Sequence, residues 1–423
     1  MSAPSSFDAV IVGGGLSGGL AALALARAGI ETAVIDAQDP AAMRAAMFDG
    51  RTTALAYASA RLFRRLGLWD AIKADAEPIR HIVVSDGRAR TRLAEGAVAP
   101  FHLHFDSREL GPDEPLGYIA PNNSIRRAIF DAVENAPMVS LIAPAKVEGA
   151  RFAAGAASVT LAGGDILSAP LVIAADGKNS SLRGQAGIKV NRWAYKQTGI
   201  VATVAHEHPH DGVAQELFLP TGPFAILPMT PNREGANLPW RSSLVWTESA
   251  EAAPAYLALD DEGFRRQIEY RFGDYLGAIG LAGPRWSYPL SFHLSQRFIA
   301  PRLALIGDAA RAIHPIAGQG FNLGVKDIAA LADVLEDAKG LGLDIGHGSV
   351  LENYQRWRRF DSATLALGTD ALNRLFSNDI GPLRFARDLG MGAVGAIPPL
   401  RRFFMRQAGA DLGRLPPLMQ AER

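Results

Sequence analysis

A glycine-rich turn near the N-terminus limits the folds open to this chain more than any other feature of its sequence. Residues 8–12 form a short apolar run, Gly13-Gly14-Gly15-Leu16-Ser17-Gly18 follows at once, and leucines and alanines then recur at helical spacing as far as Ala28. A second apolar run ends at Asp36, about 20 residues beyond the turn. This order predicts a βαβ unit at the start of an α/β fold.

The spacing of the turn suits a dinucleotide. Gly13 permits the tight turn, Gly15 lets backbone N–H groups approach a pyrophosphate, and Gly18 lets the helix pack on the strand. The phosphate charge would lie at the helix N-terminus, where unpaired N–H groups and the helix dipole favour an anion. Asp36 would bind ribose hydroxyls and disfavour a 2′-phosphate. This motif alone does not separate NAD from FAD.

Two later strands also end in a glycine and aspartate turn. Asp176-Gly177 follows the apolar residues 171–175, and Gly307-Asp308 follows residues 303–306. Either turn alone would be unremarkable as a connection between elements. Together they place carboxylates at the strand ends where α/β folds bind ligands. Their joint occurrence with the first motif indicates FAD.

Composition excludes several classes of function. The chain has 423 residues with 43 basic and 43 acidic side chains, so we expect no nucleic acid partner. It has no cysteine, which excludes disulfides, thiolate metal sites and a redox dithiol. The first residues do not form a signal peptide, and no apolar run reaches the ~20 residues of a membrane span. We expect a cytoplasmic protein without a metal site.

Over nearly its whole length the chain resembles the class A flavoprotein aromatic hydroxylases, and within them most closely the hydroxylases of ubiquinone biosynthesis. The segments that carry the resemblance are Asp49-Gly50-Arg51-Thr52-Thr53-Ala54-Leu55, Pro121-Asn122 with Arg126, residues 174–180, residues 222–228 and Gly307-Asp308 through Gly324. The last segment is the most specific, with His314-Pro315, Gly318-Gln319-Gly320 and Asn322. Arg311 departs from the family, in which histidine is common at this position.

The resemblance implies roles for particular residues. Arg51 and Arg126 should lie along FAD, Asp308 should hold its ribityl or ribose hydroxyls, and Asp176 belongs to a motif associated with FAD and the nicotinamide cofactor. The turn at Gly318, Gln319 and Gly320, with Asn322 in the same stretch, would offer N–H groups to the flavin O2 side, where negative charge develops on reduction.

The resemblance also implies the chemistry. Reduced flavin and O2 give a C4a-hydroperoxide, which hydroxylates the ring of a polyprenyl phenol or benzoquinol. Pro315 would line the pocket near the reacting carbon, and His314 is a candidate base, although a structural histidine fits equally well. Phe224 and Leu227 are candidate substrate contacts. NAD(P)H is the expected electron donor without a domain of its own, with an electron-transfer protein as the alternative.

Two kinds of sequence pattern alternate along the chain: segments typical of an α/β fold and segments of short alternating strands. We predict a Rossmann-like FAD-binding domain from residues 1–75, 118–185 and 286–345, interleaved with a mainly antiparallel substrate-binding sheet domain at 76–117 and 186–285, and a C-terminal helical region at 346–423. Within the first part, we predict a helix from Arg51 to about Leu66.

The segment from Leu383 to Leu415 combines apolar residues with six arginines and two aspartates. Such a segment can lie on an anionic membrane surface, which would place the protein at the inner face of the membrane and suit a polyprenylated substrate. Packing against the protein's own core or a second subunit is the alternative, and other proteins of quinone biosynthesis are further candidate partners.

Other functions stay open. A prenyl-chain reductase on the same scaffold would not consume oxygen, and an accessory subunit that binds FAD or quinone intermediates would not turn over. A flavin halogenase is disfavoured because the Trp-x-Trp-x-Ile-Pro motif is missing. The tract from His206 to Asp211 could suggest a metal site, but Pro209 interrupts it and favours a solvated loop between strands.

Overall fold

Four sheets organise the computed structural model, which describes residues 7–45, 47–86, 102–111, 114–232, 237–376, 390, 392–411 and 413–421. The first sheet has six strands in the order β19 (Ile299–Ala300), β20 (Leu303–Leu305), β12 (Leu171–Ala174), β1 (Ala9–Val12), β2 (Thr32–Ile35) and β8 (Val139–Ile142). All its pairings are parallel except that of β19 with β20. Its central strands are fully buried, as their continuous apolar runs require.

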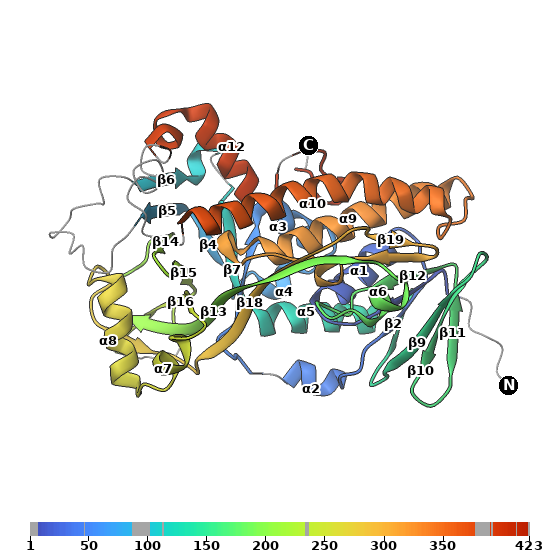
Figure 1. Ribbon diagram of the computed structural model, residues 1–423, viewed down its shortest axis with the longest axis horizontal. Helices are drawn as coiled ribbons and strands as arrows, with labels where there is room; N and C mark the ends of the chain where they lie inside the picture. The colour runs from blue at the N-terminus through green and yellow to red at the C-terminus, as the bar shows by residue number, and fades with distance from the viewer. Residues whose placement is uncertain are drawn as a thin grey trace.

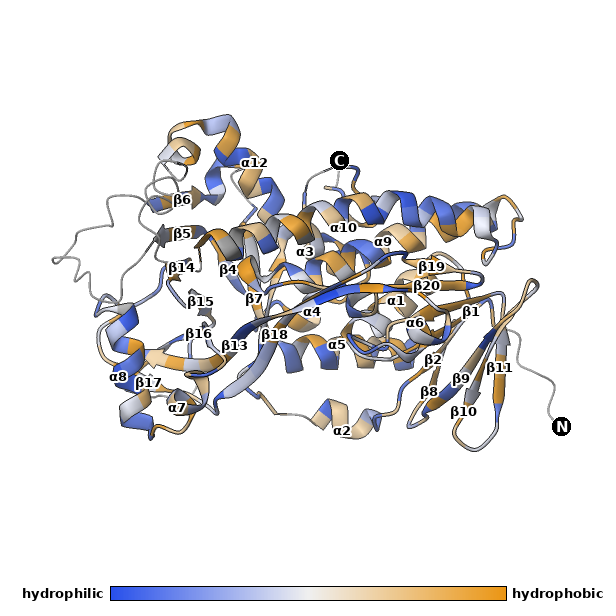
Figure 2. Cartoon of the chain, viewed as in Figure 1, coloured by the Kyte–Doolittle hydropathy of each residue, from blue (hydrophilic) through white to orange (hydrophobic). Residues whose placement is uncertain are grey.

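Helices cover one face of this parallel sheet and a small sheet covers the other (Figure 1). The helices are α1 (Leu16–Arg27), α5 (Asn122–Asn135) and α9 (Gln319–Gly340), with α10 (Gly348–Phe376) packed on α9. The small antiparallel sheet contains β9 (Val147–Phe152), β10 (Ala157–Leu161) and β11 (Ile166–Ala169). Figure 2 shows hydrophobic residues along the central strands and more hydrophilic ones along α10. The βαβ unit β1, α1, β2 is therefore the core of a layered α/β unit.

The largest sheet lies beside this unit and is almost entirely antiparallel. Its strands are β21 (Arg311–Ala312), β18 (Trp286–Ser295), β13 (Val190–His206), β16 (Trp240–Ser249), β15 (Gly222–Met229), β14 (Val213–Leu219), β5 (His81–Asp86) and β6 (His102–Asp106), and β17 (Ile279–Leu281) pairs with β13. Only β14 and β5 pair in parallel. The long strands β13 and β18 run from this sheet toward the parallel sheet (Figure 1) and join the two units.

A third small sheet lies between the two units. It consists of β3 (Thr52–Ala56), β7 (Gly117–Pro121) and β4 (Glu77–Ile79). The predicted helix from Arg51 to about Leu66 is therefore wrong in its first part, because helix α3 (Tyr57–Arg65) begins only after β3. Pairing of the β-branched residues Thr52 and Thr53 with β7 outweighs the helical pattern.

Shorter elements complete the described chain. They are α2 (Pro40–Ala45), α4 (Trp69–Ile72), η1 (Ser107–Glu109), α6 (Ser181–Gln185), α7 (Ala253–Leu257), α8 (Asp261–Phe272), η2 (Gly307–Ala309), η3 (Ile316–Gly318), α12 (Pro398–Ala408) and η4 (Pro417–Met419). Among the helices that the structure describes, none is both long and apolar enough to cross a membrane. The predicted fold class, a parallel α/β unit interleaved with a mainly antiparallel sheet, is confirmed. The exact domain boundaries stay a prediction.

Candidate functional site

The glycine turn after β1 brings backbone atoms into close contact. Gly13 has a φ of +99°, and a Cβ there would overlap the carbonyl oxygen of Ala175 at the end of β12. A Cβ on Gly18 would overlap the carbonyl oxygen of Gly13, so only glycine lets α1 pack this closely on β1. A Cβ on Gly15 would meet no atom within 4 Å. Gly15 therefore faces open space at the start of α1.

No side chain caps the N-terminus of α1, and its first turn has no acidic residue. The first N–H groups of this 12-residue helix are therefore left for an acceptor from outside the helix. Asp36, at the end of β2, accepts hydrogen bonds from the N–H groups of Gly14 at 2.6 Å and Gln38 at 2.7 Å. Its half-exposed carboxylate is thus fixed beside the same turn.

A buried arginine joins the turns after β12 and β20. Arg183 donates to the carbonyl oxygens of Lys178 at 2.9 Å and Ala309 at 2.8 Å. Asp176 accepts hydrogen bonds from the N–H groups of Ser181 and Leu182 at 2.9 and 3.3 Å, and its second carboxylate oxygen is buried without a partner among the described residues. The second and third motifs are therefore parts of one connected structure.

The side chain of Asp308 lies in the turn after β20. The side chain is exposed, yet burial by the surrounding protein raises its pKa, although the charges of Arg311 and Lys178 oppose this shift. Both observations describe a group that water reaches but protein largely surrounds. Its carbonyl oxygen accepts a hydrogen bond from Nε2 of His293 at 2.9 Å, which connects this turn to β18 of the large sheet.

A buried ion network supports the Asp308 turn from behind. Asp327 of α9 is fully buried and accepts from the N–H of Gly307 at 3.1 Å, from Arg311 at 2.5 Å and from Arg358 at 2.9 Å. Arg358 also pairs with Asp361 at 2.6 Å. This network gives Arg311, the departure from the family pattern, a structural role: it compensates a buried carboxylate.

The loop at residues 315–320 holds the start of α9 against β3. Gly318 has a φ of +62°, and a Cβ there would lie 2.8 Å from the Cβ of Ala54. Asn322 accepts from the N–H of Ala56 at 2.9 Å and donates to the carbonyl oxygen of Ala54 at 2.8 Å. Asn322 is 1% exposed, so it acts here as a clip between β3 and α9.

The start of α9 also leaves backbone donors unused by side chains. No side chain caps this 22-residue helix, and a Cβ on Gly320 would meet nothing within 4 Å. Gln319 is buried and donates to the carbonyl oxygen of Ala408 at 2.9 Å. The first N–H groups of α9 therefore suit a ligand atom that carries negative charge.

Asp49, Arg51 and Arg126 lie near one another at the entrance to β3. Arg51 donates to Asp49 at 2.8 and 2.5 Å, and the guanidinium lies 5.9 Å from the ring centroid of Trp286. Burial would raise the pKa of Asp49, but hydrogen bonds and the charge of Arg51, together with the charge of Arg126, lower it. The positive charges of both arginines that are predicted to lie along FAD therefore act on one carboxylate, which is bonded to Arg51.

The large sheet has two faces with different partners. The outer face carries Leu217, Leu219, Phe224, Ile226, Leu244 and Trp246, which form a hydrophobic core with Phe264 and Ile268 of α8. The inner face carries Ala214, Glu216, Phe218, Ala225, Leu227, Ser243, Val245 and Thr247. Phe224 is 0% exposed on the outer face, so it does not line an accessible surface, whereas Leu227 is half-buried on the inner face.

Three contacts place the inner face opposite the motifs. Ser243 receives a hydrogen bond from the hydroxyl of Thr52 in β3 at 2.9 Å. Phe218 packs in a cluster with Ile316, directly after Pro315, and with Phe376. Ala214 belongs to a cluster that includes Ala54. The inner face, β3 and the loop at 315–320 therefore border one site.

His314 and Pro315 occupy different environments. His314 is 0% exposed, neither ring nitrogen has a hydrogen-bond partner among the described residues, and its ring meets Tyr195 edge to face at 5.1 Å. Burial lowers its pKa to about 4, against a weaker raising effect of Asp370. Pro315 is half-buried, and its carbonyl oxygen accepts from the N–H of Gly318 at 2.9 Å. The buried ring of His314 thus cannot touch a ligand without rearrangement.

The tract from His206 to Asp211 contains the end of β13 and the connection to β14, as predicted for a loop between strands, but of its three histidines only His208 is exposed. His206 and His210 are 0% and 5% exposed. His206 donates to the carbonyl oxygen of His208 at 2.8 Å and accepts from Ser242, while His210 donates to the carbonyl oxygen of Met229 at 2.9 Å. Their ring nitrogens are therefore used by the protein, and no group of described residues is arranged to hold a metal ion.

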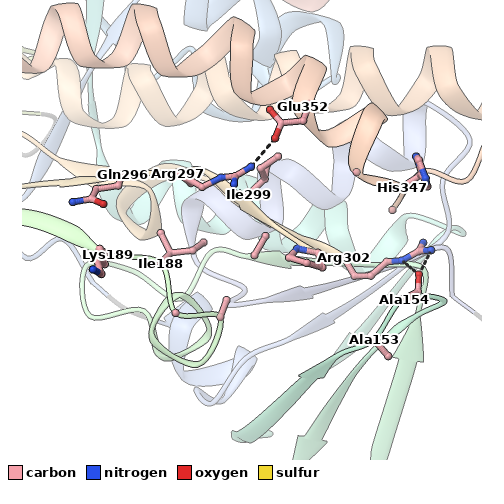
Figure 3. Close-up of a pocket in the computed structure, with 16 residues that line it drawn as sticks. Ala153, Ala154, Ile188, Lys189, Gln296, Arg297, Ile299, Arg302, His347 and Glu352 are labelled. Atoms are coloured by element: carbon pink, nitrogen blue, oxygen red, sulfur yellow. Dashed lines mark hydrogen bonds and ion pairs between the residues drawn. The ribbon is translucent and has the colours of Figure 1, made fainter.

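A surface pocket of about 740 Å³ lies elsewhere, and Figure 3 shows its residues. It is lined by residues on both sides of Ile299 and by the start of α10. Arg297 pairs with Glu352 at 2.6 Å, and Arg302 donates to the carbonyl oxygen of Ala154 at 2.6 Å (Figure 3). None of the residues in the three motifs lines this pocket, so it is separate from the candidate site.

The C-terminal segment borders the site through α12. Met405 is 1% exposed and lies in a cluster with Met229 and partly buried Leu227. Ile397, Phe403 and Phe404 are exposed at 47%, 50% and 38%. Arg401 pairs with Glu109 at 2.9 Å. Leu383, Arg384, Arg387 and Leu389 of the predicted basic segment lie outside the described residues.

Together these groups fit one extended ligand. Two uncapped helix starts, the open backbone at Gly15 and the accessible carboxylate of Asp308 suit a pyrophosphate, sugar hydroxyls and a ring that accumulates negative charge. FAD contains all three. The sequence analysis did not identify Arg183, Asp327 and Glu216 as residues of the site. Each is a single charged residue in a helix or strand, and no pattern of neighbouring residues marks it.

Comparisons with known proteins agree with this geometry. The ubiquinone hydroxylase UbiL of Rhodospirillum rubrum is 45% identical over 411 residues, covering 97% of this chain and 91% of that protein. The 3-demethoxyubiquinol 3-hydroxylase of Escherichia coli is 36% identical over 406 residues, covering 95% and 98%. The crystal structure of p-nitrophenol 4-monooxygenase PnpA from Pseudomonas putida has the same fold, with a TM-score of 0.76 at 20% identity over 97% of this chain and 100% of that one. A family model described as FAD binding domain matches residues 6–359. This chain therefore belongs to the FAD binding domain family, which confirms the flavoprotein family that its motifs predict.

Proposed function

We propose that this protein is an FAD-dependent monooxygenase that hydroxylates the aromatic ring of a polyprenyl phenol or benzoquinol intermediate in ubiquinone biosynthesis. The observation that carries the proposal is the similarity to a ubiquinone hydroxylase at 45% identity over 97% of the chain. The site geometry supports it independently, because one sheet face of small and apolar residues borders the groups that suit FAD.

The residues of the three motifs would divide the cofactor between them. Gly13, Gly15, Gly18 and Asp36 would hold the ADP half, Asp308 the linking sugar, and Gly318, Gln319 and Gly320 the flavin ring. Arg51, Arg126 and Asp176 would border the bound cofactor. Asn322 would hold the loop at 315–320 in place through its hydrogen bonds to β3. When bound, FAD supplies the activation of O2.

The protein itself would contribute binding, orientation and exclusion of water. The inner face of the large sheet would orient the ring, with Leu227 and Pro315 beside it, while the buried side chains of β3 and the loop at 315–320 keep water away. The helix N-terminus at Gly318 would stabilise negative charge on the flavin side. His314 would support the loop from behind rather than contact the ring.

Purification tests the proposal directly. We expect a yellow protein with stoichiometric FAD that converts a short-chain prenyl phenol to a product one oxygen atom heavier and consumes O2. Mass spectrometry of the product and an oxygen electrode measure the two quantities. A prenyl-chain reductase would instead add hydrogen without O2 uptake. A protein that binds FAD but gives no product with any ring intermediate would indicate an accessory subunit.

Deletion of the gene tests the pathway. We expect an intermediate that lacks one hydroxyl group to accumulate in the deletion strain, as measured by mass spectrometry of extracted lipids. Complementation by the intact gene should remove this intermediate. Normal quinone levels in the deletion strain would contradict the proposed substrate.

We further propose a reduced nicotinamide as the electron donor. Rapid mixing of the FAD-loaded protein with NADH or NADPH should bleach the flavin absorbance, and faster bleaching with phenolic substrate present would be expected for a gated hydroxylase. If neither nicotinamide bleaches the flavin but a small electron-transfer protein reduces it, the donor is that protein and this part of the proposal is wrong.

We also propose that α12 touches an anionic membrane surface. Phe403 and Phe404 on this helix and Ile397 just before it are exposed, as is Arg402, while Met405 on the same helix reaches the cluster beside the site. Such a helix could receive a substrate with a prenyl chain from the bilayer.

Vesicle sedimentation measures this binding. The double variant Phe403→Ser and Phe404→Ser should lower the fraction bound to phosphatidylglycerol vesicles by about fivefold or more, since it removes most of the inserted apolar surface. An exposed aromatic elsewhere, changed as Tyr270→Ser, is the matched control. Equal binding of the variant and the intact protein would mean that α12 does not meet the membrane.

A further inference from the structure

One charged side chain interrupts an apolar row across the inner face of the large sheet. The strand register aligns Leu103, Val84, Glu216, Ala225, Val245 and Val201 on neighbouring strands. Glu216 is the one charged member of this row. An ionisable group at such a position loses solvation energy that an apolar side chain would not lose, so its presence there suggests a functional role.

The neighbours of Glu216 along β14 place it at the site. Phe218, two residues further on the same face, packs against Ile316 and meets the ring of Phe376 at a tilt of 35°, with ring centroids 4.2 Å apart. Ala214, two residues before, packs in the cluster that contains Ala54 and Leu227. Glu216 therefore lies between Phe218, which contacts the loop at 315–320, and Ala214, which packs in the cluster beside β3.

No described residue makes a hydrogen bond or ion pair with the Glu216 carboxylate. The side chain is half-buried, so solvent reaches it, yet burial alone raises its pKa to about 7. As at Asp308, this combination describes a carboxylate that solvent reaches although protein surrounds much of it. A lone carboxylate in such a place is available to a ligand.

Other titratable groups lie near β14 but do not account for this environment. The elements packed against β14 and β15 carry Glu77 of β4, Tyr118 of β7, Arg241 and Glu248 of β16, and Asp370 toward the end of α10. His81 and His104 lie on the opposite face of β5 and β6. None of their charges contributes to the shift at Glu216, which comes from burial.

We propose that Glu216 accepts the proton of the ring hydroxyl while the ring is hydroxylated. This inference rests on the proposed function and names the base that the sequence left open. Proton removal makes the ring carbon a better nucleophile toward oxygen, and a carboxylate in an apolar wall is suited to that task.

The step balances in atoms and electrons. The ring carbon forms a bond to one oxygen atom of O2, which the reduced flavin has activated with two electrons from the donor, and the other oxygen atom leaves as water. As this bond forms, the O–H bond of the ring hydroxyl breaks, its electron pair becomes the C=O bond of a dienone, and the proton moves to Glu216. The dienone then releases the hydrogen of the oxygenated carbon to water as a proton, the electron pair of that C–H bond restores the aromatic ring, and Glu216 returns a proton to the carbonyl oxygen.

The test compares Glu216→Gln, Glu216→Asp and Gln215→Asn in the FAD-loaded protein. Gln215 is the adjacent residue of the same strand and points to the opposite face, which makes it a matched control. FAD content and unfolding are measured first. Product formation from a short-chain prenyl phenol is then followed by mass spectrometry from about pH 6 to about pH 9.

We expect the intact protein and Gln215→Asn to gain rate as the pH rises through about 7, because the carboxylate must be ionised to accept the proton. Glu216→Gln should lose about 10²-fold or more in rate and lose this pH dependence, while Glu216→Asp should retain the dependence at a lower rate. A purely structural role would change the rate without changing the shape of the profile.

Two results separate the two proposals. If the intact protein forms product and Glu216→Gln keeps both its rate and its pH profile, Glu216 is not the base and the proposed function still holds. If the intact protein with FAD forms no product from any phenol, the proposed function fails first. Should Glu216→Gln fail to bind FAD, the profile of Glu216→Asp decides the question, and a flat profile would overturn the assignment.

Discussion

The parallel sheet and the large antiparallel sheet meet their proposed ligands in different ways. At the ends of β1, β12 and β20, the groups that matter are backbone N–H donors, glycines without room for a Cβ and a few carboxylates. On the inner face of the large sheet they are side chains such as Glu216, Leu227 and Ser243. The parallel sheet therefore binds its ligand mainly through backbone groups, which differ little from one sequence to another. The large sheet meets its ligand through side chains, which a change of sequence can replace.

This difference explains why the cofactor can be read from the sequence and the substrate cannot. A glycine is required where backbone atoms nearly touch, so few residues are allowed at Gly13 and Gly18. A strand position that faces a substrate accepts many side chains. The expected effects of substitutions in the two units should differ accordingly.

The largest effect is expected from Gly18→Ala. The added Cβ would overlap the carbonyl oxygen of Gly13, and neither backbone segment can move without separating α1 from β1. We expect a loss of more than about 4 kcal/mol in the free energy of unfolding, with little FAD retained. Denaturant unfolding and flavin absorbance measure the two quantities.

The matched control is Gly15→Ala, because a Cβ there meets no atom within 4 Å. This variant should fold with nearly unchanged stability but bind FAD more weakly, since the methyl group occupies the approach to the helix start. If both variants were equally unstable, both positions would require glycine for close packing, and the proposed role of Gly15 in the approach of the cofactor would be wrong.

A smaller contrast is expected between Phe224→Ala and Leu227→Ala on β15. Phe224 is fully buried on the outer face, so its truncation should destabilise the protein by about 3–5 kcal/mol while KM for the phenol stays near that of the intact enzyme. Leu227 is half-buried on the inner face, so its truncation should change KM more than stability. Steady-state kinetics and thermal unfolding distinguish them, and the reverse pattern would exchange the roles of the two faces.

The smallest effect concerns the pH dependence of stability at the junction of the two units. His314 has its pKa lowered to about 4 by burial, from an ordinary value of 6.5. Between these values the unfolded chain binds a proton that the folded protein does not, so stability should fall as the pH decreases from about 6.5 to about 4.

His314→Leu should make this decrease shallower, as measured by denaturant unfolding of the FAD-loaded protein at several pH values. His293, whose pKa burial also lowers to about 4, remains in the variant and maintains part of the decrease. An unchanged slope would show that His314 accepts a proton in the folded state.

Sequence reasoning succeeded where a local pattern has a single physical cause. The apolar run, glycine turn and helix at residues 8–28 gave the βαβ unit, and the joint motifs gave the FAD family. It failed at β3, where pairing with a strand about 65 residues later decides the conformation of Thr52 and Thr53. It also put Phe224 among the candidate substrate contacts, since the choice of face depends on what packs behind the sheet.

The sequence by itself determined the cofactor, because a dinucleotide is held by backbone groups whose spacing is written in neighbouring residues. Only the tertiary structure decided which side chains meet the substrate. Burial of His314, the clip formed by Asn322 and the isolated carboxylate of Glu216 all arise from segments distant in the chain that pack together. Long-range packing and desolvation set these properties, and neither leaves a local pattern in the sequence.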